Sequence, residues 1–115
     1  MGRQFTILIA DRNSHVRRFL EREMLAEGYQ IRLAENGREV LKGAYECDPL
    51  DLIILDPDLP DTEAASLLKK LQDRIPPVPV VVHAFASERP GQSNVAGEMV
   101  FVEKRGNSVE RLKQL

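Results

Sequence analysis

Short apolar runs alternate with helix-forming segments along this chain, and that alternation limits the folds open to it. The runs are rich in Val, Ile and Leu without a polar alternation, which is typical of strands covered on both faces of a sheet. Between them, apolar residues recur at the spacing of amphipathic helices. Strands that alternate with helices favour a parallel sheet with right-handed crossovers, so the pattern predicts a three-layer α/β domain.

The strands of this domain are predicted from apolar content and turn residues. Their expected ranges are 5–10, 29–33, 52–55, 80–82 and 100–102. Between the last two, the segment ASERPGQSNVAG at 86–97 replaces the expected helix. Its Pro-Gly pair and small polar residues disfavour a regular helix, so a short or irregular fourth helix is predicted there.

The remaining helices have recognisable ends. Asn13 or Ser14 is expected to cap a helix that runs to about Ala26, and Gly28 supplies the left-handed residue that follows a helix end. Ser108 is expected to cap a last helix. Two sets of apolar residues fall at helical spacing: Val16, Phe19, Leu20 and Met24; and Ala64, Leu67, Leu68 and Leu71. The helix between them is expected to bury Val40, Leu41, Ala44 and Tyr45.

Length and composition narrow the class of protein. At 115 residues the chain suits a single domain over 1–115, either a whole regulator or a piece of a longer one. Its single cysteine, Cys47, excludes an intramolecular disulfide and favours a reducing compartment, so a cytoplasmic location is expected. A net charge of −2 argues against nucleic-acid binding through bulk charge, and no apolar run is long enough to span a membrane.

Charged side chains follow several of the predicted strands. Asp11 ends the first strand, Asp56 the third and Glu103-Lys104 the fifth, while His83-Ala84 ends the fourth. In open parallel sheets, ligands bind beyond the carboxyl ends of the strands. Two carboxylates and a lysine are therefore expected to converge on one edge of the sheet.

Taken in order, several segments resemble a response-regulator receiver domain, the phosphoacceptor module of two-component signalling. They are ILIAD at 7–11, AENGREVL at 34–41, DLIILDPDLP at 51–60, VPVVV at 78–82 and AGEMVFVEK at 96–104. The resemblance runs from about Phe5 to Leu115. It implies a flavodoxin-like, doubly wound five-stranded parallel sheet in the order 2-1-3-4-5. It also implies a signalling protein that accepts a phosphoryl group and turns over no substrate.

The resemblance assigns roles to individual residues. Asp56 would be the phosphoacceptor, and Mg²⁺ would be held by Asp11, Asp56 and the backbone carbonyl of Asp58. Lys104 would contact the phosphoryl group, and Phe101 occupies the aromatic switch position. The implied partners are a sensor histidine kinase or phosphotransfer protein, a downstream effector domain and a second copy of the chain.

Three residues depart from the family pattern. Arg12 stands where a second acidic residue is usual, Ala84 where a hydroxyl side chain is usual, and Arg105 where a proline usually follows the lysine. A cation beside the metal position opposes Mg²⁺ binding, so a weak Mg²⁺ site and a weakened switch are predicted. Arg12 could instead pair with Asp56 and imitate the ion's charge.

Other interpretations stay open at this stage. The chain could be a pseudo-receiver that works as an interaction module without phosphorylation. Asp56-Pro-Asp58 also fits the DxD motif of haloacid-dehalogenase-type phosphatases, although here it follows the third strand rather than the first. More plainly, Asp56 could be a turn carboxylate and Asp11 a helix cap. Asp58 and Asp61 are expected to be solvated or helix-capping.

Overall fold

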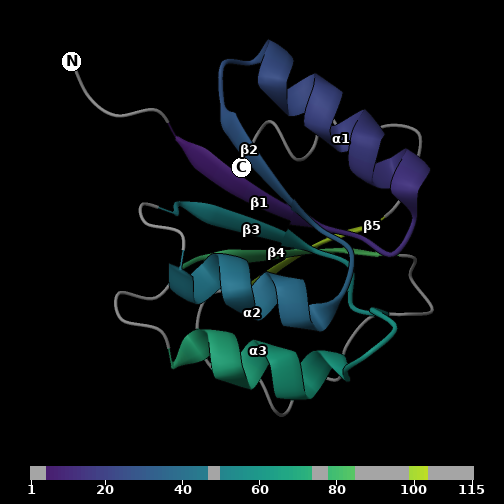
Figure 1. Ribbon diagram of the computed structural model, residues 1–115, viewed down its shortest axis with the longest axis vertical. Helices are drawn as coiled ribbons and strands as arrows, with labels where there is room; N and C mark the ends of the chain where they lie inside the picture. The colour runs from purple at the N-terminus through teal and green to yellow at the C-terminus, as the bar shows by residue number, and fades with distance from the viewer. Residues whose placement is uncertain (1–4, 47–49, 74–77, 85–98, 104–115) are drawn as a thin grey trace.

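The architecture is a parallel sheet with helices on both faces, as the sequence predicts (Figure 1). The computed structural model describes residues 5–46, 50–73, 78–84 and 99–103. The sheet has five strands in the order β2-β1-β3-β4-β5, and every neighbouring pair is parallel. The strands are β1 (Thr6–Ala10), β2 (Gln30–Ala34), β3 (Leu52–Leu55), β4 (Val80–Ala84) and β5 (Met99–Glu103).

Three helices are described, and they divide between the two faces of the sheet. In Figure 1, α1 lies on one side, and α2 and α3 lie together on the other. Their bounds are Ser14–Ala26 for α1, Gly37–Glu46 for α2 and Ala64–Gln72 for α3. The predicted irregular segment at 86–97 and the predicted last helix from Ser108 lie outside the described residues.

The ends of α1 follow from local chemistry that the sequence makes visible. The Asn13 side chain accepts hydrogen bonds from the backbone N–H groups of His15 and Val16, which confirms Asn13 as the N-cap. Just past the helix, Gly28 has a φ of 91°. A residue with a Cβ is strained at that angle, so glycine is needed where the chain turns into β2.

The start of α2 is capped by a related arrangement. The Asn36 side chain accepts from the Glu39 N–H at 2.9 Å. The Glu39 carboxylate reaches back to the Glu35 N–H, also at 2.9 Å, rather than to Asn36 itself. The first turn of α2 therefore has its orphan donors satisfied largely by side chains.

Two hydrophobic clusters hold the layers together. Alternate residues of β1 point to opposite faces, so Ile7 and Ile9 pack with Leu20 and Met24 of α1. On the other face, Leu8 and Ala10 pack with side chains from α2 and α3. The members contributed by α2 and α3 are Val40, Ala44, Leu67, Leu68 and Leu71, with Leu41 partly buried against them.

Two aromatic residues at helical spacing are exposed, although Tyr45 is expected on a buried face. Phe19 is 44% exposed and lies under the Arg22 guanidinium, and Tyr45 is 54% exposed. The Tyr45 hydroxyl donates to the Lys70 carbonyl at 2.6 Å, so the ring spans from α2 to α3 instead of entering the core. Spacing marks a helix face roughly, and residues at its margin are decided by what packs beside them.

None of the helices in the described ranges is long and apolar enough to cross a bilayer.

Candidate functional site

The strand register places Asp11 and Asp56 side by side at the carboxyl edge of the sheet. Ala10 of β1 pairs with Leu55 of β3, so the next residue on each strand lies at the same level. The Asp56 N–H donates to the Ala10 carbonyl at 2.8 Å, and the Asp11 N–H donates to the Ala34 carbonyl at 3.2 Å. The expected convergence of these two carboxylates is therefore confirmed.

Asp56 is a fully buried carboxylate held by backbone donors from two loops. Its residue exposure is 0%. One oxygen, Oδ2, accepts from the Arg12 N–H at 3.1 Å, and the other, Oδ1, accepts from the Asp58 N–H at 3.1 Å. A buried carboxylate must have such partners, because desolvation would otherwise make its charge costly. These bonds fix the plane in which the carboxylate lies.

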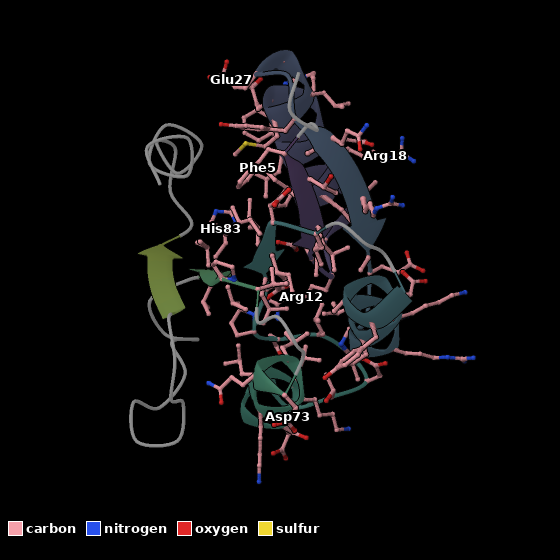
Figure 2. All side chains as sticks on the ribbon, turned by 90° about the vertical axis from the view of Figure 1, so that its left-hand side faces the viewer. Phe5, Arg12, Arg18, Glu27, Asp73 and His83 are labelled. Atoms are coloured by element: carbon pink, nitrogen blue, oxygen red, sulfur yellow. The ribbon has the colours of Figure 1, made fainter. Side chains whose placement is uncertain are left out.

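Arg12 turns its guanidinium toward this carboxylate. Its Nε lies 3.6 Å from Asp56 Oδ2, and its side chain is 32% exposed. The ion pair that the sequence raises as an alternative to metal binding is therefore present. In Figure 2, Arg12 is seen at mid-height, between Arg18 of α1 above and Asp73 beyond α3 below.

The same guanidinium also binds Asp58. Arg12 Nη1 donates to the Asp58 backbone carbonyl at 3.3 Å and to the Asp58 carboxylate. The Asp58 side chain is 67% exposed, so this contact lies at the outer edge of the site. The sequence predicts a solvated or capping Asp58 and misses its contact with Arg12, because no local motif links residues so far apart in the chain.

Asp11 is buried and works within the β1–α1 loop. Its Oδ1 accepts from the Asn13 N–H at 2.9 Å, just ahead of the helix that Asn13 caps. Its backbone carbonyl accepts from Arg17 Nη1 at 2.7 Å, and Arg17 Nη2 lies 3.5 Å from Glu35. These contacts hold the loop against the ends of β1 and β2.

Asp61, at the far end of the loop after β3, caps α2. Its carboxylate accepts from the N–H groups of Gly37 at 2.6 Å and Arg38 at 3.1 Å. The hydrogen bond from Gly37, assisted by that from Arg38, lowers the pKa of Asp61 below its ordinary value and outweighs the opposing effect of desolvation. A solvated or helix-capping Asp61 is expected, and the helix that it caps is not the one that follows it in sequence.

Gly37 is needed for this cap to close. A Cβ added there would lie 2.4 Å from Thr62 Cγ2 and 3.1 Å from Asp61 Oδ1. Glycine therefore lets the loop after β3 lie directly against the first turn of α2.

The other predicted site residues are placed only in part. Ala84 ends β4, where it pairs with Glu103 of β5, and Phe101 pairs with Val82. Lys104 and Arg105 lie outside the described residues. His83, inside the apolar strand β4, is buried at 3% exposure.

The residues implied as Mg²⁺ ligands have the right chemistry but are already engaged. Carboxylate and carbonyl oxygens are the donors that Mg²⁺ prefers. Arg12, however, donates to the Asp58 carbonyl and pairs with Asp56. Within the described residues, no group of three His, Cys, Asp or Glu side chains is arranged to hold a metal ion. As arranged, these oxygens do not fit a divalent cation beside the guanidinium, because two cations there would repel.

Comparisons with known proteins agree with this fold. The family model described as the response regulator receiver domain matches residues 7–114. The DNA-binding transcriptional regulator NtrC of Proteus hauseri is 30% identical over 95 residues, which are 83% of this chain and 20% of that protein. The chain thus spans about a fifth of the length of this relative.

Solved structures show the same architecture. The signal receiver domain of a Luxo repressor protein from Vibrio parahaemolyticus matches with a TM-score of 0.78 and 25% identity, covering 97% of this chain and 86% of that one. The response regulator TrrA from Thermotoga maritima, solved in complex with Mg²⁺-BeF, matches with a TM-score of 0.80 and 27% identity over 96% of each chain. With the family model covering nearly its whole length, the chain belongs to the response-regulator receiver domain family.

Proposed function

We propose that this receiver domain accepts a phosphoryl group on Asp56 and carries it as a signal in a phosphorelay. The observation that supports this most is the state of Asp56: fully buried at the end of β3, with each oxygen accepting a backbone N–H from a different loop. A carboxylate held in a fixed orientation is prepared for in-line attack on phosphorus.

The chemistry required of the chain is a single transfer. An Asp56 oxygen attacks the phosphorus of the donor, a new O–P bond forms, and the bond from phosphorus to the leaving group breaks. The leaving group keeps that electron pair, and Asp56 becomes an acyl phosphate. The donor would be the phosphohistidine of a sensor kinase or phosphotransfer protein. Because the group is accepted and not turned over, the domain is not an enzyme in the usual sense.

The proposal includes a weak Mg²⁺ site formed by Asp11, Asp56 and the Asp58 carbonyl. Arg12 must leave those oxygens before the ion can enter, so affinity is lowered. Lys104 is proposed to contact the phosphoryl group, and Phe101 to respond to it. Ala84 cannot donate the hydrogen bond that a hydroxyl would give, so coupling between phosphorylation and the end of β4 is weakened.

A second candidate is a pseudo-receiver that acts as an interaction module without phosphorylation. The Arg12–Asp56 ion pair favours it, because a permanent cation beside the acceptor could hold one conformation without any phosphoryl group. In both cases we propose a cytoplasmic domain over 1–115 with no direct role in nucleic-acid or membrane binding. Its output would come from an effector domain or from pairing with a second copy.

The two candidates separate on treatment with acetyl phosphate, and in parallel with beryllofluoride, each with and without Mg²⁺. A phosphoacceptor gains one phosphoryl mass with acetyl phosphate, and Asp56→Asn does not. Its amide NMR signals near Asp11 and Asp56 shift with either reagent. If the wild-type chain gains no mass and shows no shift under any of these conditions, the phosphoacceptor proposal is wrong and the interaction module is favoured.

A further inference from the structure

The Arg12 guanidinium contacts oxygens that the receiver resemblance assigns to a metal ion. Two of the three expected ligands, the Asp56 carboxylate and the Asp58 carbonyl, contact its guanidinium. The third, Asp11, is the neighbouring residue in the chain, and its carboxylate accepts from the Asn13 N–H. The protein itself therefore supplies a positive charge beside Asp56, the Arg12 guanidinium.

The guanidinium is held at this place by more than one contact. The Asp58 carboxylate binds Nη1 from the outside, while the backbone N–H of Arg12 donates to Asp56 from within. Both ends of the Arg12 residue are thus tied to the β3–α3 loop. A long side chain fixed in this way loses less conformational freedom when it meets a ligand.

Guanidinium chemistry suits the group that Asp56 would receive. A planar guanidinium carries several N–H donors in a fork that matches the oxygens of a phosphoryl group, and it stays protonated at any physiological pH. With Nε 3.6 Å from Asp56 Oδ2, a phosphoryl group on Asp56 would lie against the guanidinium. The side chain is 32% exposed, so a small donor in solution can approach it.

We propose that Arg12 replaces the divalent cation, so that phosphoryl transfer to Asp56 proceeds without Mg²⁺. This rests on the proposed function, since it assumes that Asp56 is the acceptor. In the step, an Asp56 oxygen attacks the phosphorus of an acyl phosphate such as acetyl phosphate, and the bond from phosphorus to the acetate oxygen breaks. Acetate leaves with that electron pair, and Arg12 balances the charge on the phosphoryl oxygens throughout. Asp58 is a positioning residue that orients Arg12.

The test compares rates of phosphoryl mass gain from acetyl phosphate in EDTA and in excess Mg²⁺. The wild-type chain is expected to react in EDTA, with a rate that Mg²⁺ changes little. Arg12→Gln keeps much of the length and hydrogen-bonding capacity but removes the charge, and it should slow the EDTA reaction by about tenfold or more. Arg12→Asp should slow it likewise and make the reaction depend on Mg²⁺. Asp58→Ala should give a smaller loss, because it removes only the orienting carboxylate.

Matched controls separate this effect from net charge and from misfolding. Arg18→Asp makes the same change of charge at an exposed residue of α1, and its two rates should follow the wild type. Amide NMR spectra of each variant check that the fold is kept. Asp56→Asn should gain no mass under either condition.

The outcomes distinguish a failure of the role proposed for Arg12 from a failure of the role proposed for Asp56. A wild-type chain that reacts only with Mg²⁺ overturns the role of Arg12 and leaves Asp56 as the acceptor. A wild type that never reacts overturns both the role of Arg12 and the proposed function of this chain, and an Arg12→Asp variant that then reacts with Mg²⁺ shows that Arg12 blocks phosphoryl transfer to Asp56. If neither chain reacts under any condition, the proposed function itself fails.

Discussion

The loop after β3 carries one aspartate at each end, and the two have opposite surroundings. At the acceptor end, Asp56 is fully buried, and its partners are the Arg12 N–H and guanidinium and the Asp58 N–H. At the capping end, Asp61 is exposed and binds the first N–H groups of α2. The same type of side chain is therefore a buried carboxylate with compensated charge at one end and an exposed helix cap at the other.

The difference shows how burial changes what a carboxylate can do. Asp56 follows a strand covered on both faces, so its charge is compensated by donors that the fold supplies at fixed positions. Asp61 lies where water solvates it, and it gains from the positive end of a helix. The capping end holds the loop against α2, and the acceptor end faces the β1–α1 loop.

The largest effect is expected at the acceptor end. Asp56→Asn should remove all phosphoryl mass gain, because an amide is too weak a nucleophile to attack phosphorus. Asp61→Asn should keep the mass gain, since Asp61 contacts α2 and not the acceptor. Intact mass after acetyl phosphate treatment measures both. If Asp61→Asn by itself also abolished the phosphoryl mass gain, the separate roles given to Asp56 and Asp61 would be wrong.

Next in size is a change in metal affinity. Arg12→Asp combined with Ala84→Thr should raise Mg²⁺ affinity by about tenfold or more. The change removes the repulsion between the guanidinium and the ion, which is about 4 kcal/mol at 4 Å and an effective dielectric of 20, and solvent screening reduces this value. It should also raise the response to phosphorylation. Calorimetric titration with Mg²⁺ measures the affinity.

The control for this pair is Arg18→Asp with Ala84→Thr. It makes the same charge change away from the site, so its affinity should stay near the wild-type value. Equal gains in both double variants would mean that bulk charge, and not the position of Arg12, sets Mg²⁺ binding.

A steric effect is expected at the capping end. Gly37→Ala should destabilise the fold by about 1–3 kcal/mol, because the added methyl meets Thr62 Cγ2 at 2.4 Å. Urea unfolding monitored by circular dichroism measures the loss. Adding Thr62→Ser removes the clashing methyl and should restore much of the stability.

Gly43→Ala, in the same helix, provides a matched control. Its added methyl meets a terminal carbon of Leu8 at 3.2 Å, a contact that needs a shift of only a few tenths of an ångström. Since alanine also favours the helix, the net change should be small. A cost at Gly43 as large as that at Gly37 would indicate that any methyl in α2 is poorly tolerated, and that the loop contact is not special.

The smallest effect concerns the charge of Asp61. Its pKa is lowered in the folded chain, chiefly by the Gly37 hydrogen bond. Its contribution to stability is therefore present above the unfolded-state pKa and is lost as pH falls through the folded one. Asp61→Asn should lower the melting temperature by a few degrees at pH 7, and the gap from wild type should close as the solution is acidified. A gap that stays constant down to pH 3 would contradict this account.

Much of the fold can be predicted from the sequence, because its signals are local. The apolar run at 52–55 predicts the third strand with its observed bounds, and Asn13 and Gly28 mark the ends of α1 correctly. Each of these depends on residues within one turn or one strand. The prediction that Tyr45 belongs to the buried face of its helix is wrong, and Phe19, which falls at helical spacing, is also exposed. Spacing alone does not tell how wide the covered stripe of a helix is.

The sequence predicts which residues form the candidate site better than it predicts which partners those residues contact. The carboxyl ends of parallel strands meet at one edge, so the positions of Asp11 and Asp56 at two strand ends are enough to place them together. The roles of Asp58 and Arg17 are not predicted, since each bonds a partner that no motif joins to it. The sequence raises the Arg12–Asp56 ion pair only as an alternative to a weak Mg²⁺ site.

By itself, then, the sequence determined the order of strands and helices, the receiver resemblance and the residues at the carboxyl edge. Periodicity, caps and turn residues act over a few positions, so they can be recognised from neighbouring residues in the sequence. The tertiary structure alone decided where Arg12 directs its charge and which helix Asp61 caps. Those contacts join residues 46 and 24 positions apart. Because such side chains take whatever partners folding brings near them, their roles follow from packing and not from local pattern.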